Sequence, residues 1–199
     1  MADIISKSDP SMRRLANAAN DPTRSPPDPV DSEQKLRVVE LLFFAYRDFT
    51  GEPDAALAGY GLGRAHHRVL HFVARHPGLR VADLLEVLKI TKQSLARVLK
   101  QLVDDGWIEQ RPGPNDRRER LLTLTDTGAN LAKRLADLQS ARIAAALAEL
   151  GPDGAAAVER FLFAIITPSE RASVAKMLAD AAQTLADASN ASHAAPTPE

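Results

Sequence analysis

Residues 91–126 decide the fold of this chain: they read TKQSLARVLKQLVDDG (91–106), WIEQR (107–111), PGPNDRRER (112–120) and LLTLTD (121–126). The first part has the period of an amphipathic helix, and the second and fourth have the character of short strands. Pro, Gly and Asn between the two strands are turn residues. The order helix, strand, basic turn, strand predicts a winged helix-turn-helix.

The predicted helix over Thr91–Asp105 has one apolar stripe and one polar face. The stripe consists of Leu95, Val98, Leu99, Leu102 and Val103. We expect Thr91 to cap its N-terminus and Gly106 to follow its C-terminus. The polar face carries Lys92, Gln93, Ser94, Arg97, Lys100 and Gln101. Gln pairs with adenine and Arg with guanine in a bidentate manner, while Lys and Ser suit phosphates or either base. The helix is a candidate for reading base edges, and an ordinary solvated surface helix is the alternative.

Three arginines, Arg117, Arg118 and Arg120, lie at or beside the tip of the predicted hairpin. Arginine suits a narrow, negatively charged minor groove. We expect the Asp116 carboxylate to pair with the Arg118 guanidinium and to hold its direction. From Lys89 to Arg120 the chain has eight basic and five acidic residues, whereas the whole chain has a net charge of −1. A local basic patch on a near-neutral protein indicates a DNA-binding surface.

The preceding residues complete the motif. We expect a helix over Leu62–His76, a short strand at Leu79–Val81, the first helix of the helix-turn-helix over Val81–Leu88, and a turn at Lys89–Thr91. The predicted fold class is therefore mainly α with a small β-hairpin wing.

Further helices are predicted on both sides of this motif, over Leu36–Phe49, Thr127–Leu150, Pro152–Ile166 and Pro168–Ala186. The first is apolar over more than half of its circumference. A chain of 199 residues cannot bury all of these faces internally, so we expect a homodimer. The expected organisation is a mobile extension (1–31, with a short helix around Ser11–Ala19), an N-terminal dimerisation helix and linker (32–60), a winged helix-turn-helix DNA-binding domain (61–126), C-terminal dimerisation helices (127–188) and a disordered tail (189–199).

The chain resembles the MarR family of bacterial transcriptional regulators over about residues 33–150. The segments that carry the resemblance are RVLHFVARHPGLRVADLLEVL (68–88), ITKQSLARVLKQLVDDGWIEQR (90–111) and the wing signature PNDRRERLLTLTDTG (114–128). Within the family, LLFFAYRDFTGEPD (41–54) through LGRAHHRVL (62–70) resembles the branch that includes PetP.

The resemblance implies a transcriptional regulator with no cofactor that binds a pseudo-palindromic operator as a homodimer. It implies that Thr91–Asp105 is the recognition helix, that Arg118 enters the minor groove, and that Asp116 braces it. It also implies modulation by a small-molecule effector. The candidate DNA-binding residues are Thr91, Lys92, Gln93, Ser94, Arg97, Lys100, Arg117, Arg118 and Arg120.

Histidines in the helix before the motif raise the question of a metal or ligand site. His67 and His71 are four residues apart, so both face one side of a helix. No third ligand and no HExxH motif accompany them, so we predict no metal site. Candidate pocket residues for a small molecule are Tyr60, His66, His67, His71 and Trp107.

Composition narrows the remaining classes of protein. The sequence has no Cys, so it has neither disulfides nor a thiol with which to sense peroxide. It has no apolar run of membrane-spanning length and no signal-peptide core at its start, so we expect a cytoplasmic protein. No nucleophile elbow or paired carboxylates indicate an enzyme. The alternative function is a helical dimeric adaptor or ligand-sensing protein that does not bind DNA.

Overall fold

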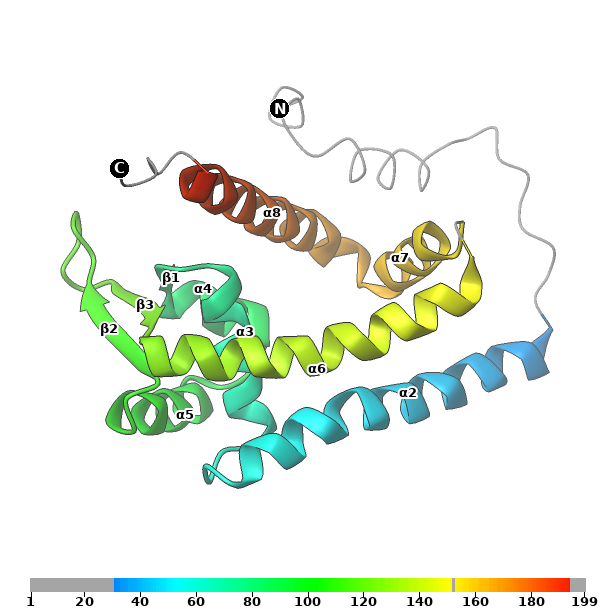
Figure 1. Cartoon of the computed structure of the whole chain (residues 1–199), viewed down its shortest axis with the longest axis horizontal. Coiled ribbons are helices and arrows are strands. Elements are labelled where there is room, and N and C mark those ends of the chain that lie inside the picture. Colours follow the sequence, from blue (N-terminus) through cyan, green and yellow to red (C-terminus); the bar gives the residue numbers. More distant parts are fainter. Residues whose placement is uncertain (1–30, 152, 194–199) are drawn as a thin grey trace, which may run out of the picture. The chain divides into compact units, whose positions relative to one another are not determined.

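The computed structural model describes residues 31–151 and 153–193, which form two compact units, one ending at Ala146 and the other beginning at Leu147. The first unit contains α2 (Ser32–Ala58), α3 (Arg64–Arg75), β1 (Leu79–Arg80), α4 (Val81–Leu88), α5 (Lys92–Asp104), β2 (Ile108–Pro112), β3 (Arg120–Leu124) and most of α6 (Asp126–Leu150) (Figure 1). The second contains α7 (Gly154–Ile165), the short 3₁₀ helix η2 (Pro168–Glu170) and α8 (Arg171–His193). The mainly helical fold class with a small β wing is confirmed. The expected mobile extension and its short helix lie outside the described residues.

The small sheet holds the hairpin against the helices. Its strands are antiparallel in the order β1-β3-β2, with Leu79 opposite Leu122 on one side and Gln110 opposite Leu122 on the other. Leu122, in the central strand, is fully buried. Because β1 directly precedes α4, the sheet connects the wing to the first helix of the helix-turn-helix.

The core of the first unit is built from the apolar stripes of α3 to α6 around β3. It contains Val69, Leu70 and Val73 of α3, Leu84 and Leu88 of α4, Leu95, Val98, Leu99 and Leu102 of α5, Ile108 and Leu122 of the sheet, and Leu131 and Leu135 of α6. Within each helix these side chains are linked by steps of three or four residues, as one buried face requires. Fully burying each Leu or Val contributes about 1.5–3 kcal/mol, so this core fixes α5 and the base of the wing as one body.

The junction of β3 and α6 depends on Thr125 and Gly128. The Thr125 hydroxyl donates to the Gly106 carbonyl at 2.7 Å and accepts from the Gly128 amide at 3.0 Å. A Cβ on Gly128 would lie 2.0 Å from the carbonyl oxygen of Trp107. A residue without a side chain is therefore needed where α6 starts beside the hairpin.

α2 extends further than the sequence predicts. We expected its end near Phe49, but the helix continues through Pro53 to Ala58. Pro53 and Leu57 are buried, and Leu57 belongs to the core cluster. Thr50 is also buried, and its hydroxyl donates to the Tyr46 carbonyl at 2.8 Å. Burial of this segment therefore compensates for the helix-breaking tendency of Gly51 and Pro53.

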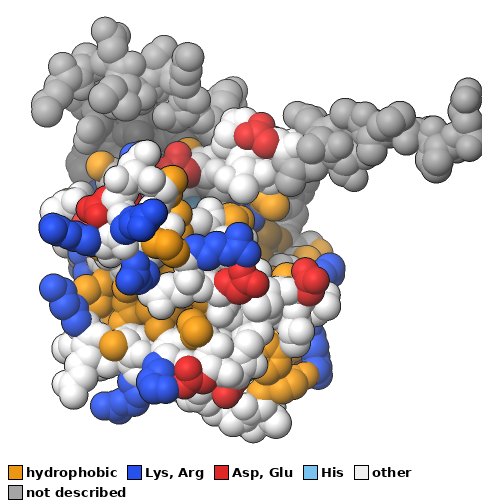
Figure 2. All heavy atoms as spheres, turned by 90° about the vertical axis from the view of Figure 1, so that its left-hand side faces the viewer, with side chains coloured by type: hydrophobic (Ala, Val, Ile, Leu, Met, Phe, Trp, Pro, Cys, Tyr) orange, Lys and Arg blue, Asp and Glu red, His pale blue; other side chains and the backbone are white. Residues whose placement is uncertain are grey.

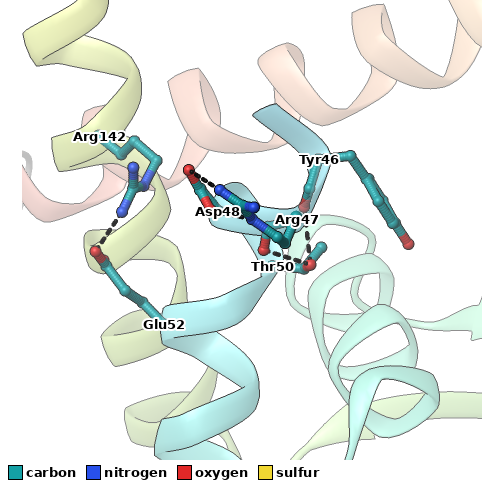
Figure 3. A network of polar contacts seen from close by, with 6 residues as sticks. All are labelled: Tyr46, Arg47, Asp48, Thr50, Glu52 and Arg142. Carbon is teal, nitrogen blue, oxygen red and sulfur yellow. Dashed lines mark hydrogen bonds and ion pairs between the residues drawn. The ribbon is translucent and has the colours of Figure 1, made fainter. Parts of the chain in front are cut away.

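Polar contacts link the middle of α2 to α6 (Figure 3). Arg142 of α6 pairs with Glu52 of α2 at 2.5 Å, and beside them Arg47 pairs with Asp48 at 2.7 Å. The pKa of Asp48 lies below its ordinary value, chiefly because Arg47 hydrogen-bonds its carboxylate. Of these exposed pairs, Arg142–Glu52 connects the two helices, whereas Arg47–Asp48 lies within α2.

α8 also exceeds its predicted length, because it reaches His193. The helix therefore includes residues 189–193, which we expected to belong to the tail. No Gly or Pro occurs between Ser189 and His193, so no local breaker stops the helix. No described helix is both long and apolar enough to cross a bilayer.

Candidate nucleic-acid interface

α5 forms as the sequence predicts. The Thr91 hydroxyl accepts from the Ser94 amide at 3.1 Å and donates to the Ser94 hydroxyl at 2.9 Å, so Thr91 is the N-cap. Gly106 follows the helix with φ +75°, a conformation that favours glycine. Leu95 is 2% and Leu102 0% exposed, which turns the opposite face outward. Five of the six polar residues that we expected on that face are exposed: Lys92, Gln93, Ser94, Arg97 and Lys100.

The turn between α4 and α5 is held from α3. Lys89 ends α4 in the left-handed conformation, with φ 51°. Arg68 of α3 donates from Nη2 to the Leu88 carbonyl at 3.2 Å. A cation at a helix C-terminus satisfies an orphan carbonyl and opposes the negative end of the helix dipole. Arg68 therefore helps to set the angle at which α5 leaves the turn.

Lys100 and Gln101, near the end of the polar side of α5, also have partners within the protein. The Lys100 ammonium pairs with Asp104 one turn later, and the pKa of Lys100 is raised, chiefly by this hydrogen bond. Gln101 is half-buried: its Nε2 donates to the Gly61 carbonyl at 3.3 Å, and its Oε1 lies 3.0 Å from His66 Nε2. Gln101 therefore joins α5 to the loop before α3 rather than extending the outward face.

The wing turn differs in one contact from our expectation. Asp116 Oδ1 accepts a hydrogen bond from the main-chain amide of Arg118 at 2.8 Å, whereas we expected the carboxylate to pair with the guanidinium. A side-chain acceptor two residues before its donor forms an Asx turn, which shapes the backbone. Arg120 donates from Nη1 to the Arg117 carbonyl at 2.6 Å. Arg117, Arg118 and Arg120 are all exposed.

Sequence reasoning missed Arg80, which joins the wing to α4. Its guanidinium donates to both carboxylate oxygens of Asp83 at 2.7 Å and to Glu119 Oε1 at 3.0 Å. These contacts raise the pKa of Arg80, the Asp83 hydrogen bonds most and the Glu119 hydrogen bond next. Arg80 and Glu119 are 39 residues apart, so no local pattern indicated the pair.

The outward face of α5 and the hairpin lie at the same end of the first unit. Figure 2 views that end of the molecule and shows Lys and Arg side chains spread over its surface, with acidic side chains among them. Such a mixture lets the cations approach phosphates while internal pairs hold some of them in place.

The candidate pocket residues do not form one cluster of free side chains. Tyr60 and Trp107 meet edge to face, with ring centroids 5.3 Å apart. His66 Nδ1 accepts from the Gly63 amide at 3.1 Å, and His71 meets Phe72 edge to face on the surface. Trp107 Nε1 is buried without a hydrogen-bond partner in the described part of the chain.

His67 is buried within α3 with 6% of its surface exposed. Burial lowers the pKa of His67, because desolvation disfavours the imidazolium. Within residues 31–151 and 153–193, no group of three His, Asp or Glu side chains is placed to bind a metal ion.

A helix-turn-helix of α4 and α5 followed by the β2–β3 hairpin defines a winged-helix protein. The model of the family described as MarR family matches residues 60–119. The HTH-type transcriptional regulator PetP of Rhodobacter capsulatus is 48% identical over 139 residues, which cover 70% of this chain and 84% of that protein. The multiple antibiotic resistance protein MarR of Escherichia coli is 40% identical over 52 residues, 26% of this chain and 36% of that protein.

Solved structures share the fold. A mutant of MarR from E. coli complexed with operator DNA superposes with a TM-score of 0.53 at 24% identity, covering 69% of this chain and all of that chain. The S. aureus MepR–DNA complex gives a TM-score of 0.55 at 16% identity, covering 64% of this chain and 95% of that chain. The chain belongs to the MarR family of transcriptional regulators. Proteins of this kind act in transcription and are not enzymes, in agreement with the sequence.

Proposed function

We propose that this regulator binds a pseudo-palindromic operator as a homodimer, with α5 in the major groove and the wing in the minor groove. The observation that carries the proposal is the exposed polar face of α5, whose opposite side is buried in the core. A helix fixed in this way presents its side chains to base edges without reorganising. The similar MarR structure complexed with operator DNA supports DNA as a partner of this fold.

The proposed base-reading residues are Gln93 and Arg97, and the proposed phosphate contacts are Lys92, Ser94 and Lys100, with Thr91 at the cap. Gln and Arg make bidentate contacts to adenine and guanine, whereas Lys is a point charge that suits phosphate. Arg118 is proposed to enter the minor groove, with Arg117 and Arg120 beside it. Asp116 would brace this turn through the Arg118 main chain.

Exposed apolar side chains on α2 support the homodimer. The first half of this helix carries Leu36, Leu41, Leu42, Phe43 and Phe44, and Phe43 is 71% exposed. α7 has no buried residue, although Phe161, Leu162 and Ile165 are apolar. Apolar faces of this extent usually meet a partner. We therefore assign residues 32–60 and 127–188 to dimerisation and 61–126 to DNA binding.

The experiment is selection of duplexes from a random pool by the full-length protein, followed by titration of the selected site at two salt concentrations. We expect two inverted half-sites about 10 base pairs apart and affinity that falls steeply with salt. Sedimentation should give a dimer at micromolar concentration. Failure to enrich any sequence, with no binding at low salt, would favour the alternative of an adaptor that does not bind DNA.

A small-molecule effector is part of the proposal, supported by the buried Trp107 Nε1 that lacks a hydrogen-bond partner among the described residues. Trp107 is the single Trp of the sequence, so its fluorescence reports on this place. Small phenolic compounds should change both this fluorescence and the affinity for DNA. If neither quantity changes, the effector is rejected while the DNA-binding proposal stands.

A further inference from the structure

Arg80 occupies an unusual position between the helix-turn-helix and the wing. It is the last residue of β1 and the N-cap residue of α4, but its side chain makes no cap hydrogen bond. Its guanidinium instead forms a bidentate contact with the carboxylate of Asp83 of α4. It also donates to the carboxylate of Glu119 of the wing at 3.0 Å. One planar cation thus holds two carboxylates from different elements.

Glu119 is an acid among the basic residues of the wing. It lies next to Arg118 and Arg120 in the chain. The ion-pair partner of its carboxylate is Arg80, whereas Arg120 donates to the main-chain carbonyl of Arg117. A free carboxylate at this place would face the phosphates that the wing arginines approach, and like charges repel.

The wing backbone is shaped so that Glu119 lies along it. The Gly113 amide donates to the Glu119 carbonyl at 3.1 Å. A Cβ on Gly113 would lie 2.8 Å from the Asp116 carbonyl oxygen and 3.1 Å from Glu119 Oε2. Because Gly113 has no side chain, it leaves room for the Glu119 carboxylate, which contacts Arg80.

The Arg80–Glu119 pair is at the surface, with 50% and 36% of the two side chains exposed. Exposed ion pairs add little to stability. We therefore expect the pair to affect the charge of the wing more than the stability of the protein.

We propose that Arg80 is a positioning residue for DNA binding, which neutralises Glu119 and holds its carboxylate against α4, away from the phosphates. This inference rests on the proposed function, because it requires the wing to approach DNA. Arg80 thus changes the affinity for DNA without contacting the nucleic acid itself.

The test compares the full-length protein with Arg80→Ala, Glu119→Gln and the double variant, by fluorescence anisotropy on the site that the parent protein selects. We expect Arg80→Ala to bind about tenfold more weakly, and the double variant to return to within about threefold of the parent. Glu119→Gln alone should stay within about twofold of the parent. The loss in Arg80→Ala should shrink as salt rises from about 50 to 200 mM, because the repulsion is screened.

The matched control is Lys133→Ala, which removes another exposed cation that is paired with an acid, here Asp137 on α6. It should bind like the parent. Arg80→Gln removes the same charge and is measured as a second variant, in case Arg80→Ala does not fold. Thermal unfolding of both variants shows which of them is folded.

Three results would overturn the inference: Arg80→Ala binding like the parent, a double variant as weak as Arg80→Ala, or Glu119→Gln as weak as Arg80→Ala. The second would mean that Arg80 contacts DNA directly, and the third that the ion pair shapes the wing. A parent protein that binds no DNA would instead reject the proposed function.

Discussion

The side-chain amide nitrogen of Gln139 donates to the main-chain carbonyl of Phe49 at 3.4 Å, across 90 residues of sequence. Phe49 lies four residues before Pro53, which has no amide hydrogen to donate to that carbonyl. Gln139 of α6 therefore supplies a donor at the place where the proline of α2 lacks one. The contact explains how α2 tolerates Pro53 while it packs beside α6.

Removing Gln139 should destabilise the protein only while Pro53 is present. Gln139→Leu should lower the free energy of unfolding by about 1–2 kcal/mol, because it leaves a partly buried carbonyl without this donor. In a Pro53→Ala background the new amide supplies a donor, so the same change should cost less. Denaturant titration of the four proteins measures the coupling. Equal costs in both backgrounds would show that Gln139 does not compensate for the proline.

Substitutions on the exposed polar face of α5 should distinguish the residues that set sequence specificity from those that set general affinity for DNA. Gln93→Ala or Arg97→Ala should weaken binding to the selected site by about 1–3 kcal/mol and relax preference at one base pair per half-site. Lys100→Ala should weaken all sequences about equally, since a phosphate contact carries no base information. The measurement is the ratio of specific to random-site affinity. An unchanged ratio in both Gln93→Ala and Arg97→Ala would mean that another face reads the bases.

The wing turn allows charge to be separated from geometry at Asp116. Asp116→Ala should weaken DNA binding although it removes an acid, because the Arg118 amide loses its acceptor. Asp116→Asn should bind at least as well as the parent, since Asn keeps an acceptor oxygen without the charge. Arg118→Ala should weaken binding and reduce preference for A·T-rich flanks.

Titration with DNA at matched salt shows whether the charge of Asp116 or its hydrogen bond to the Arg118 amide affects binding. If Asp116→Ala binds as tightly as Asp116→Asn, charge alone matters and the turn geometry does not. Asp116→Ala and Arg118→Ala should also cost less together than the sum of the two single changes.

The exposed aromatic face of α2 should control the oligomeric state. Phe43→Glu should weaken self-association by about 2 kcal/mol or more, because Phe43 is exposed in the single chain and available to a partner. The control Gln110→Glu adds the same charge at an exposed position of β2. Sedimentation at several concentrations compares the two. Equal dimer stability in both variants would remove this face from the interface.

Burial of His67 should make stability depend on pH. Its pKa is lowered in the folded protein, so the unfolded chain takes up the proton more readily. The stability that this group contributes is present above the unfolded pKa of about 6.5 and is lost as pH falls below it. His67→Gln, which does not titrate, should show a weaker loss of unfolding free energy between pH 7.5 and about pH 5.5. Parallel pH curves for the two proteins would contradict the assignment.

The local elements of the DNA-binding region were predictable because their signals lie close together in sequence. The apolar stripe of α5, its Thr91 cap, and the turn residues between β2 and β3 each act over a few neighbouring positions. Boundaries failed where burial outweighed a local breaker, as at Pro53 in α2. They also failed where no breaker was present, as in the last turns of α8.

The sequence by itself determined the winged helix-turn-helix, since periodicity, caps and turn chemistry are properties of residues a few positions apart. Only the tertiary structure decided which distant polar groups meet. Arg80 reaches Glu119 across 39 residues, and Gln139 reaches the Phe49 carbonyl across 90. It also decided that Asp116 holds the main chain of the wing rather than a guanidinium. Hydrogen bonds depend on positions within fractions of an ångström, and the packing of the whole core sets those positions.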